Sequence, residues 1–474
     1  MISYSSLFQI RQAITHDKLS CKGLVSYYLD NIRQKSHLNA FLEVYEEDAL
    51  NQAEKIDEKF KSGTQGRLAG MVVGIKDVFC YKDHPLQCSS KILDGFYSQF
   101  TATAVQRLLD EDAIIIGRQN CDEFAMGSST ENSAFGVTRN AANPDRVPGG
   151  SSGGSAVAVQ ADMCLVSIGS DTGGSVRQPA AFCGIIGMKP TYSRISRYGL
   201  TAYASSFDCV GILSKSVEDT ALVLEIISGA DEFDSTVSQK EVTSYSQTLD
   251  FSGKAKIAYL SETIDSPGLN PVVREKTLQK LEWLKSQGHT VEAVDFPLLK
   301  YILPDYYILT TAEASSNLAR YDGVRYGFRS ENTKDLESLY KKTRNEGFGA
   351  EVKRRIMLGT FVLSADYYDA YYTKAQKIRR LIKEGTERIF SNYDFIVSPA
   401  TPNTAFEIGA HKEDPLEMYL EDIFTVQANV AGIPAISIPN GQGADGMPIG
   451  FQIMSDFFKE DKLLAFSQYL LGSV

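Results

Sequence analysis

The chain has 474 residues, with 48 Lys and Arg against 59 Asp and Glu, so its formal net charge is −11. This length allows a large buried core. An acidic chain is a poor candidate for binding nucleic acid on its own, because phosphate contacts need clustered basic side chains. Its apolar runs are shorter than the eighteen or so residues that span a membrane, and its first twenty residues lack the apolar core of a secretory signal. We therefore expect a cytoplasmic protein.

Cysteine and histidine usage excludes two further classes of site. The seven cysteines form no CxxC pair and lie mostly in apolar contexts, which favours reduced cysteines in a protein core. The five histidines show no HExxH or related spacing. We expect neither a disulfide framework nor a metal site.

The N-terminal segment, residues 1–65, reads as helical. Ser5 and Ser20 are candidate N-caps, and the stretch LVSYYLDNI has apolar residues at helical spacing.

From about residue 68 the pattern changes to short apolar runs that alternate with helical segments. This alternation predicts an α/β fold in which a large mixed sheet is covered by helices on both faces. The expected strands are 71–75, 113–117, 164–169 and 184–188, and the expected helices lie at 102–112 and after residue 153.

The second half of the chain continues this pattern. A helix is predicted to begin at Ser216 and end at Gly229, followed by a polar surface excursion over 230–252. Residues 302–392 read as mostly helical. Strands are expected at 256–260, 290–296, 394–400, 435–441 and 448–454, and a long helix is expected to end near Gly288. We interpret 1–474 as one domain, with core motifs in 66–215 and a helical, substrate-side region in 300–392.

Two glycine-serine stretches, GGSSGGSAVAV (149–159) and GSDTGGSVRQPAAFCG (169–184), carry the chemistry. A flexible linker would stay polar, and a phosphate loop would bring a lysine, but apolar residues follow the first stretch at once. Gly-Gly pairs allow a tight turn from strand to helix, which directs amide N–H groups at one spot. The second stretch is a candidate oxyanion hole with a nucleophilic serine, formed by Thr172, Gly173, Gly174 and Ser175.

A serine nucleophile needs a base, and no histidine lies in or near these stretches. Lys76 ends the apolar run MVVGIK, where burial could lower its pKa and leave it neutral. The alternative is a surface lysine at a strand end, paired with Asp77.

The combination of Lys76, SSGGS (151–155) and DTGGSVRQPAAFCG (171–184) resembles the amidase signature family. That resemblance implies a catalytic triad of Lys76, Ser151 and Ser175, with a cis peptide bond at the middle serine, which relays a proton between the other two. It implies acyl transfer from an amide with release of ammonia. Ser152 is interpreted as a hydrogen-bonded scaffold residue that supports Lys76. Ser193 stands where the family often has glycine.

Further segments resemble one branch of this family, whose members are the glutaminase subunits of heterotrimeric amidotransferases that act on glutamate carried by tRNA. These segments are 123–136, 196–211, 319–327, 351–364 and 419–439. The branch resemblance implies that Arg355 binds the α-carboxylate of glutamine, Asp422 its α-ammonium group, and that Tyr306 lies nearby. The alternatives are a solvated helix face for Arg355, core packing for Tyr306 and a helix-start acid for Asp422.

The branch resemblance also implies partners: two subunits, B and C, with the mischarged tRNA held mainly by a partner. No phosphate loop appears in this sequence, so ATP and magnesium are expected on a partner and no cofactor in this chain. Whether aspartate on tRNA(Asn) is also a substrate stays open. The alternative functions are a stand-alone amidase for small amides and, from another class, an inactive scaffold subunit.

Overall fold

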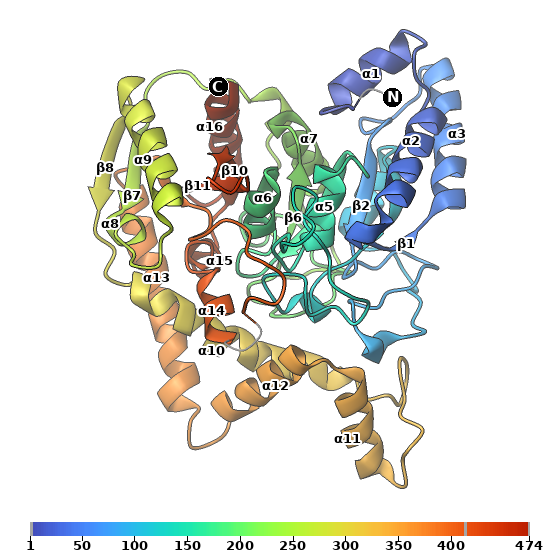
Figure 1. Cartoon of the computed structure of the whole chain (residues 1–474), viewed down its shortest axis with the longest axis vertical. Coiled ribbons are helices and arrows are strands. Elements are labelled where there is room, and N and C mark those ends of the chain that lie inside the picture. Colours follow the sequence, from blue (N-terminus) through green and yellow to red (C-terminus); the bar gives the residue numbers. More distant parts are fainter. Residues whose placement is uncertain (1–2, 412–414, 473–474) are drawn as a thin grey trace.

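A computed structural model describes residues 3–411 and 415–472 (Figure 1). Its centre is an 11-stranded mixed sheet in the order β1-β3-β2-β4-β6-β5-β10-β11-β9-β7-β8. The strands are β1 (Phe41–Val44), β2 (Val72–Lys76), β3 (Ile114–Gln119), β4 (Val166–Asp171), β5 (Ile186–Lys189), β6 (Cys209–Ser214), β7 (Lys256–Leu260), β8 (Thr290–Val294), β9 (Phe395–Pro399), β10 (Ala435–Gln442) and β11 (Pro448–Ser455).

Sixteen α-helices accompany this sheet in the described residues. The first eight are α1 (Leu7–Thr15), α2 (Cys21–Gln34), α3 (Glu46–Ser62), α4 (Thr103–Asp110), α5 (Gly153–Gln160), α6 (Arg177–Cys183), α7 (Val217–Ile227) and α8 (Ser261–Ile264). The others are α9 (Pro271–Ser286), α10 (Leu299–Asn317), α11 (Leu336–Gly347), α12 (Ala350–Val362), α13 (Lys374–Phe390), α14 (Pro415–Leu420), α15 (Val426–Ala431) and α16 (Glu460–Gly472).

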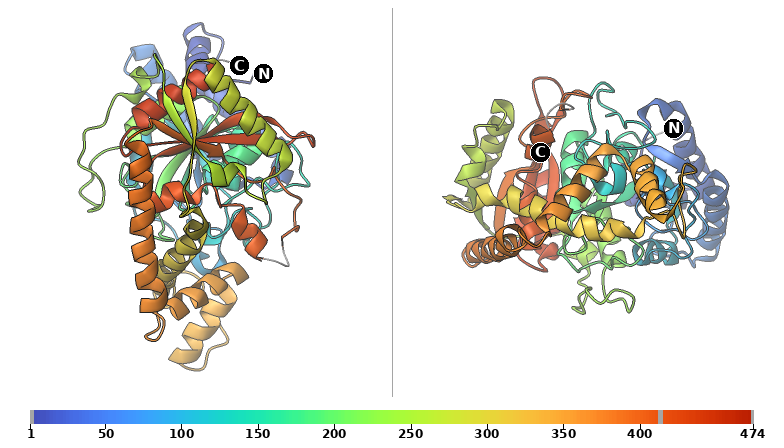
Figure 2. Two further views of the ribbon diagram at one scale, coloured as in Figure 1. Left: turned by 90° about the vertical axis from the view of Figure 1, so that its left-hand side faces the viewer. Right: turned by 90° about the horizontal axis from the view of Figure 1, so that it is seen from below.

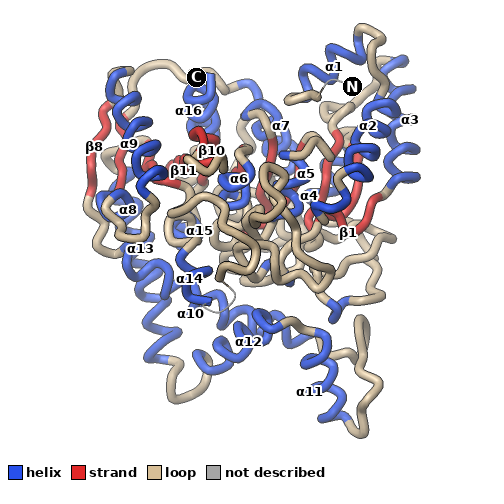
Figure 3. The backbone as a smooth tube through the Cα atoms, in the orientation of Figure 1, coloured by secondary structure: helices blue, strands red, loops and turns tan. Residues whose placement is uncertain are grey.

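The helices cover both faces of the sheet, as the alternating sequence pattern predicts (Figures 2 and 3). On one face, α5 packs on β2, β4 and β6, and α6 packs on β5, β10 and β11. On the other, α7 packs on β6, and α16 packs on β10 and β11. The α/β/α architecture with a mixed sheet is confirmed, because parallel pairs such as β2–β4 stand beside antiparallel pairs such as β4–β6.

The N-terminal segment differs from the prediction in two respects. It contributes β1, which pairs antiparallel with β3 and forms one edge of the sheet, so the segment is not helical throughout. The first helix is capped by Ser6 rather than Ser5, whereas Ser20 caps α2 as expected. The four residues of β1 are all half-buried, and a strand this short shows little alternation to detect.

Other elements agree with the sequence to within a few residues. Ser216 caps α7 through its hydroxyl, although the helix ends at Ile227, two residues before Gly229. All seven cysteines are buried and free. Within the described residues there is no helix that is both long enough and apolar enough to cross a membrane.

Residues 299–390 form a helical arm, of which α11 and α12 project away from the sheet while α13 runs back to pack on α15 and β9 (Figure 1). The helices α10 and α12 pack closely, since a Cβ atom at Gly359 would lie only 1.9 Å from the Thr311 carbonyl oxygen. The mostly helical reading of this region is confirmed.

The parallel pair β2–β4 positions the chemistry. The register pairs Ile75 with Ile168, so the strands end side by side with Lys76 on one and Ser170 and Asp171 on the other. Carboxyl ends of parallel strands meet at one sheet edge, and this is where α/β proteins usually bind ligands.

The first stretch of glycines allows α5 to approach this edge, which gives a stability prediction. A Cβ atom at Gly154 would lie 2.4 Å from the Asn120 carbonyl oxygen. Gly154→Ala should therefore force the helix from the sheet, at a cost of about 1–3 kcal/mol. We expect the midpoint of thermal unfolding to fall by a few degrees. The matched control is Gly268→Ala, because a Cβ atom there meets nothing within 4 Å. Equal midpoints for the two variants would contradict this account of the packing.

Candidate active site

Lys76 is fully buried at the end of β2. Its Nζ lies 2.6 Å from Ser151 Oγ and 2.9 Å from Ser170 Oγ. The alternative of a surface lysine paired with Asp77 is wrong. Asp77 is itself buried, and its carboxylate contacts Arg118 at 3.3 Å.

The surroundings of Lys76 favour the neutral amine. Burial lowers the pKa of Lys76 below its ordinary value, and the opposing effects of Cys121, Asp122 and Asp171 do not reverse that shift. Asp171 is neutralised by a partner of its own, Arg177. A neutral amine beside a hydroxyl can accept its proton, so Lys76 and Ser151 have the geometry of a base and a relay.

The first glycine-serine stretch gives its two serines different partners, since Ser151 contacts Lys76 and Ser152 contacts the second stretch. The peptide bond between Gly150 and Ser151 is cis. Ser152 donates through its hydroxyl to the Ser170 carbonyl oxygen at 3.2 Å and through its backbone N–H to the Ser175 carbonyl oxygen at 3.1 Å. Ser152 therefore joins the ends of both motifs, which is consistent with the scaffold role predicted for it.

Ser175 follows β4 in the turn that leads into α6, and its exposed fraction is 8%. Its hydroxyl forms no hydrogen bond with any residue in 3–411 or 415–472. The Gly174 N–H is directed at Asp171 Oδ1 at 2.9 Å, so it is engaged. The backbone N–H groups of Thr172, Gly173 and Ser175 remain as the candidate oxyanion donors. The predicted set of four is thus reduced to three in this geometry.

A buried ion pair holds this turn in place. Asp171 accepts from the Arg177 guanidinium through both oxygens, at 2.9 and 3.0 Å, and from Asn429 Nδ2 at 2.9 Å. Burial alone would raise the pKa of Asp171, but Arg177 lowers it to about 2. Arg177 also donates to the Thr425 carbonyl oxygen and to Gln452 Oε1. The turn is therefore tied to two distant segments of the chain.

Glycine at 173 and 174 lets two other side chains approach the turn. A Cβ atom at Gly173 would lie 2.5 Å from the Tyr306 hydroxyl, and one at Gly174, whose φ is +130°, would lie 2.1 Å from Thr425 Oγ1. Tyr306 also packs edge-on against Phe207 and Tyr307. It is both a core residue and a wall of the site, so the two readings of Tyr306 are compatible.

Arg355 is buried on the inner side of α12, and the alternative of a solvated helix face is wrong. Its Nε donates to Glu351 Oε1 at 2.8 Å and its Nη1 donates to the Tyr203 hydroxyl at 2.8 Å. The rings of Tyr203, Tyr307 and Tyr419 lie 5.3–5.6 Å from the guanidinium carbon. These contacts hold the Arg355 guanidinium in place, and its remaining N–H groups can donate to a carboxylate.

Asp422 is buried between α14 and α15. Its Oδ2 accepts from Ser128 Oγ at 2.7 Å and from the Tyr307 hydroxyl at 3.4 Å. Its side chain caps neither helix, so the helix-start alternative is wrong. Burial raises the pKa of Asp422 to about 7, and a bound ammonium group would favour the carboxylate form. Tyr307 thus bridges the buried cation and anion.

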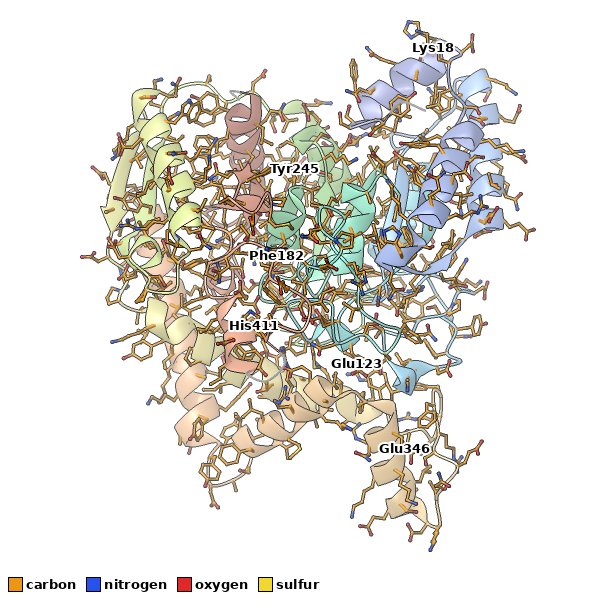
Figure 4. The ribbon with its side chains drawn as sticks, in the orientation of Figure 1. Lys18, Glu123, Phe182, Tyr245, Glu346 and His411 are labelled. Carbon is orange, nitrogen blue, oxygen red and sulfur yellow. The ribbon has the colours of Figure 1, made fainter. Side chains whose placement is uncertain are left out.

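A cavity of about 500 Å³ opens beside Arg355 and is lined in part by Glu351, Arg355 and Tyr419. The helix that carries Arg355 is anchored at its start, because Glu123 Oε2 accepts the Gly349 N–H at 2.8 Å. Glu123 lies where the body of the protein meets the arm (Figure 4).

Sequence reasoning missed several polar residues of this site. Ser170, Asp171 and Arg177 lie within the second glycine-serine stretch, and a pattern of buried polar residues beside the nucleophile could have indicated them. Ser128 and Tyr203 had no local signal, because their partners Asp422 and Arg355 lie far away in sequence. Glu351 lies four residues before Arg355 on one helix, and this spacing could have indicated the pair.

The geometry predicts that Ser175 reacts with a fluorophosphonate at a rate controlled by Lys76. The rate should rise with pH as Lys76 loses its proton, and level off below the ordinary lysine pKa of about 10.4. Lys76→Met should slow labelling at least 100-fold and remove this rise. The control is Lys189→Met, which removes another fully buried lysine whose pKa burial lowers. A similar loss in both variants, corrected for folded fraction by circular dichroism, would contradict the assignment.

Comparison with known proteins agrees with this geometry. The family pattern described as Amidase matches residues 23–464. The A subunit of glutamyl-tRNA(Gln) amidotransferase from Chlorobium luteolum is 50% identical over 471 residues, covering 99% of this chain and 97% of the relative. The crystal structure of the same subunit from Thermotoga maritima is 39% identical with a TM-score of 0.77, covering 94% of this chain and 91% of that one. The structure of 6-aminohexanoate cyclic dimer hydrolase with substrate is 25% identical with a TM-score of 0.85, covering 99% and 97%.

Proposed function

The chain belongs to the amidase family, and from this premise we propose that it is the glutaminase subunit of a tRNA-dependent amidotransferase. It hydrolyses glutamine and supplies ammonia for the conversion of Glu-tRNA(Gln) to Gln-tRNA(Gln). The observation that carries this proposal is the 50% identity to such a subunit over 99% of the chain. The buried contact between Lys76 and Ser151 supports an active rather than a scaffolding role.

The first chemical step forms a tetrahedral intermediate on Ser175. Ser175 Oγ attacks the side-chain amide carbon of glutamine, its proton passes to Ser151 Oγ, and the Ser151 proton passes to neutral Lys76. The carbonyl oxygen becomes an oxyanion that the amides of Thr172, Gly173 and Ser175 stabilise. The relay requires the two serine hydroxyls to approach each other, and the hydrogen bond from Ser152 to the Ser175 carbonyl already holds their backbones together.

The second step releases ammonia and glutamate. Protonated Lys76 returns its proton through Ser151 to the departing nitrogen, the carbon–nitrogen bond breaks, and ammonia leaves. Water then attacks the ester on Ser175 with the same groups acting as base, which frees glutamate and restores the hydroxyl. Removing one oxyanion donor typically costs about 10²–10³ in rate, so the full rate also depends on the turn that Asp171 and Arg177 hold in place.

The buried charge pair selects a free amino acid. Arg355 receives the α-carboxylate and Asp422 the α-ammonium group, with Tyr306 beside the reacting end. A zwitterion places an opposite charge against each of these residues, whereas a plain amide brings neither charge.

The partners and cofactors belong to this proposal as well. We propose a heterotrimer with B and C subunits, in which a partner holds the tRNA, ATP and magnesium, and a cytoplasmic location. The support is the subunit designation of the relatives and the absence of a phosphate loop from the sequence.

Kinetics of pocket variants separate glutamine recognition from general amidase activity. Arg355→Lys and Asp422→Asn should raise the KM for glutamine at least tenfold. The first loses the planar guanidinium contact with the carboxylate, the second loses the charge opposite the ammonium group, and each contact is worth about 1.5–3 kcal/mol. Hydrolysis of butyramide, which lacks both charges, should change little. The control is Lys353→Ala on the same helix, whose side chain donates to the Asn345 carbonyl oxygen. Unchanged glutamine kinetics in both pocket variants would favour a stand-alone amidase.

The amidotransferase function itself is tested in the purified complex. Ser175→Ala should abolish formation of Gln-tRNA(Gln) from glutamine, because no acyl-enzyme can form. The same complex should still make it from added ammonium chloride, since the partner chemistry is intact. Retained glutamine-dependent activity would refute the role of Ser175.

A further inference from the structure

The helix that carries Arg355 has a second face that points outward and is apolar. Arg355 and Glu351 lie on the buried side of α12, but Met357, Leu358 and Phe361 are 72%, 40% and 43% exposed. Exposed apolar residues are common singly, whereas a contiguous group marks an interaction site. Met357 is only two residues from Arg355.

The group continues onto the turn after α12 as a preformed aromatic cluster. Phe361 lies 4.3 Å from Tyr367 and 5.8 Å from Tyr371, ring centre to ring centre, and Tyr367 lies 6.0 Å from Tyr371. All three rings are exposed. We call Met357, Leu358, Phe361, Tyr367 and Tyr371 the outer patch. Rigid aromatic rings lose little conformational entropy on binding, and aromatic residues and Met are enriched at protein interfaces.

The charge of the arm indicates which partner fits. Residues 299–390 contain 17 Lys and Arg against 12 Asp and Glu, a net charge of +5 in a chain of −11. Exposed charges of both signs lie at the outer patch: Asp366 and Asp369 stand between its aromatic residues, and Lys374 and Lys377 follow it without an ion pair to a residue in the described ranges. A second copy docked about a twofold axis would place two such basic arms together, which is unfavourable. An acidic surface is favoured instead.

Resting on the function proposed above, we infer that the outer patch docks a partner subunit of the amidotransferase, through an apolar segment flanked by acidic side chains. The partner would then bind to α12, the helix whose Arg355 holds the glutamine carboxylate. Helix α12 crosses α10 closely at Gly359, so the outer patch is in mechanical contact with α10, the helix that carries Tyr306. Binding of the partner would restrain Arg355 and Tyr306 together, so glutamine should bind more tightly in the complex than to the free chain.

The first test measures affinity between the full-length chain and the co-purified B and C subunits by biolayer interferometry. Met357→Asp with Phe361→Asp should weaken binding at least tenfold, and Lys374→Glu with Lys377→Glu should weaken it and reduce its dependence on salt. The matched control is Phe8→Asp, at a residue of α1 that is 68% exposed. It should bind like the wild type. Unchanged affinity in the patch variants would overturn the inference.

A second measurement needs no variant and so does not depend on how the variants fold. Dilute hydrogen peroxide should oxidise Met357 in the free chain, and the complex should slow this oxidation at least fivefold, as read by mass spectrometry of peptides. Equal oxidation rates would place the partner elsewhere. A wild-type chain that binds neither B nor C would overturn the proposed function, whereas a complex that leaves Met357 open would overturn only the outer patch.

Discussion

The site depends on one constraint, the burial of a lysine amine at the end of β2 beside a serine hydroxyl. A buried ammonium group without a paired carboxylate is costly, and burial lowers the pKa of Lys76 accordingly. Of the acids that act on Lys76, Asp171 is committed to Arg177, and the neighbouring Asp77 is committed to Arg118. Lys76 can therefore act as a base in place of histidine. Because β2 and β4 are parallel neighbours, Lys76 and the turn that carries Ser175 lie at the same edge of the sheet.

The buried ion pair of Asp171 and Arg177 fixes the position of the nucleophile, just as burial sets the protonation state of the base. It bridges the turn of Ser175 to α15 and β11, which come from the C-terminal part of the chain. Breaking such a pair leaves an uncompensated buried charge and costs about 3–5 kcal/mol. The oxyanion donors are therefore held in place by residues that lie about 250 positions away in the sequence. The local sequence alone does not determine where these donors lie.

This separation explains what could be predicted. The strands at 71–75, 113–117 and 164–169 were visible because buried parallel strands are continuous apolar runs, and the motif residues Lys76, Ser151 and Ser175 because their spacing resembles the family. Strands β1 and β6 were missed, since β1 is short and half-buried and β6 follows a long loop. The contacts of Ser128 with Asp422 and of Tyr203 with Arg355 span 294 and 152 positions, so only the folded chain reveals them. Ser193, where glycine was expected, adopts a φ of +75°, a backbone conformation that favours glycine.

The central claim, a neutral Lys76, is tested most directly by following lysine Nζ signals with NMR on ¹⁵N-lysine-labelled protein through a pH titration. Comparison with Lys76→Arg assigns the signal. The account predicts a lysine that titrates well below the ordinary pKa of about 10.4 and whose signal is missing from the variant. A Lys76 signal that titrates at or above the ordinary value would contradict it, because a charged amine cannot accept the proton of Ser151.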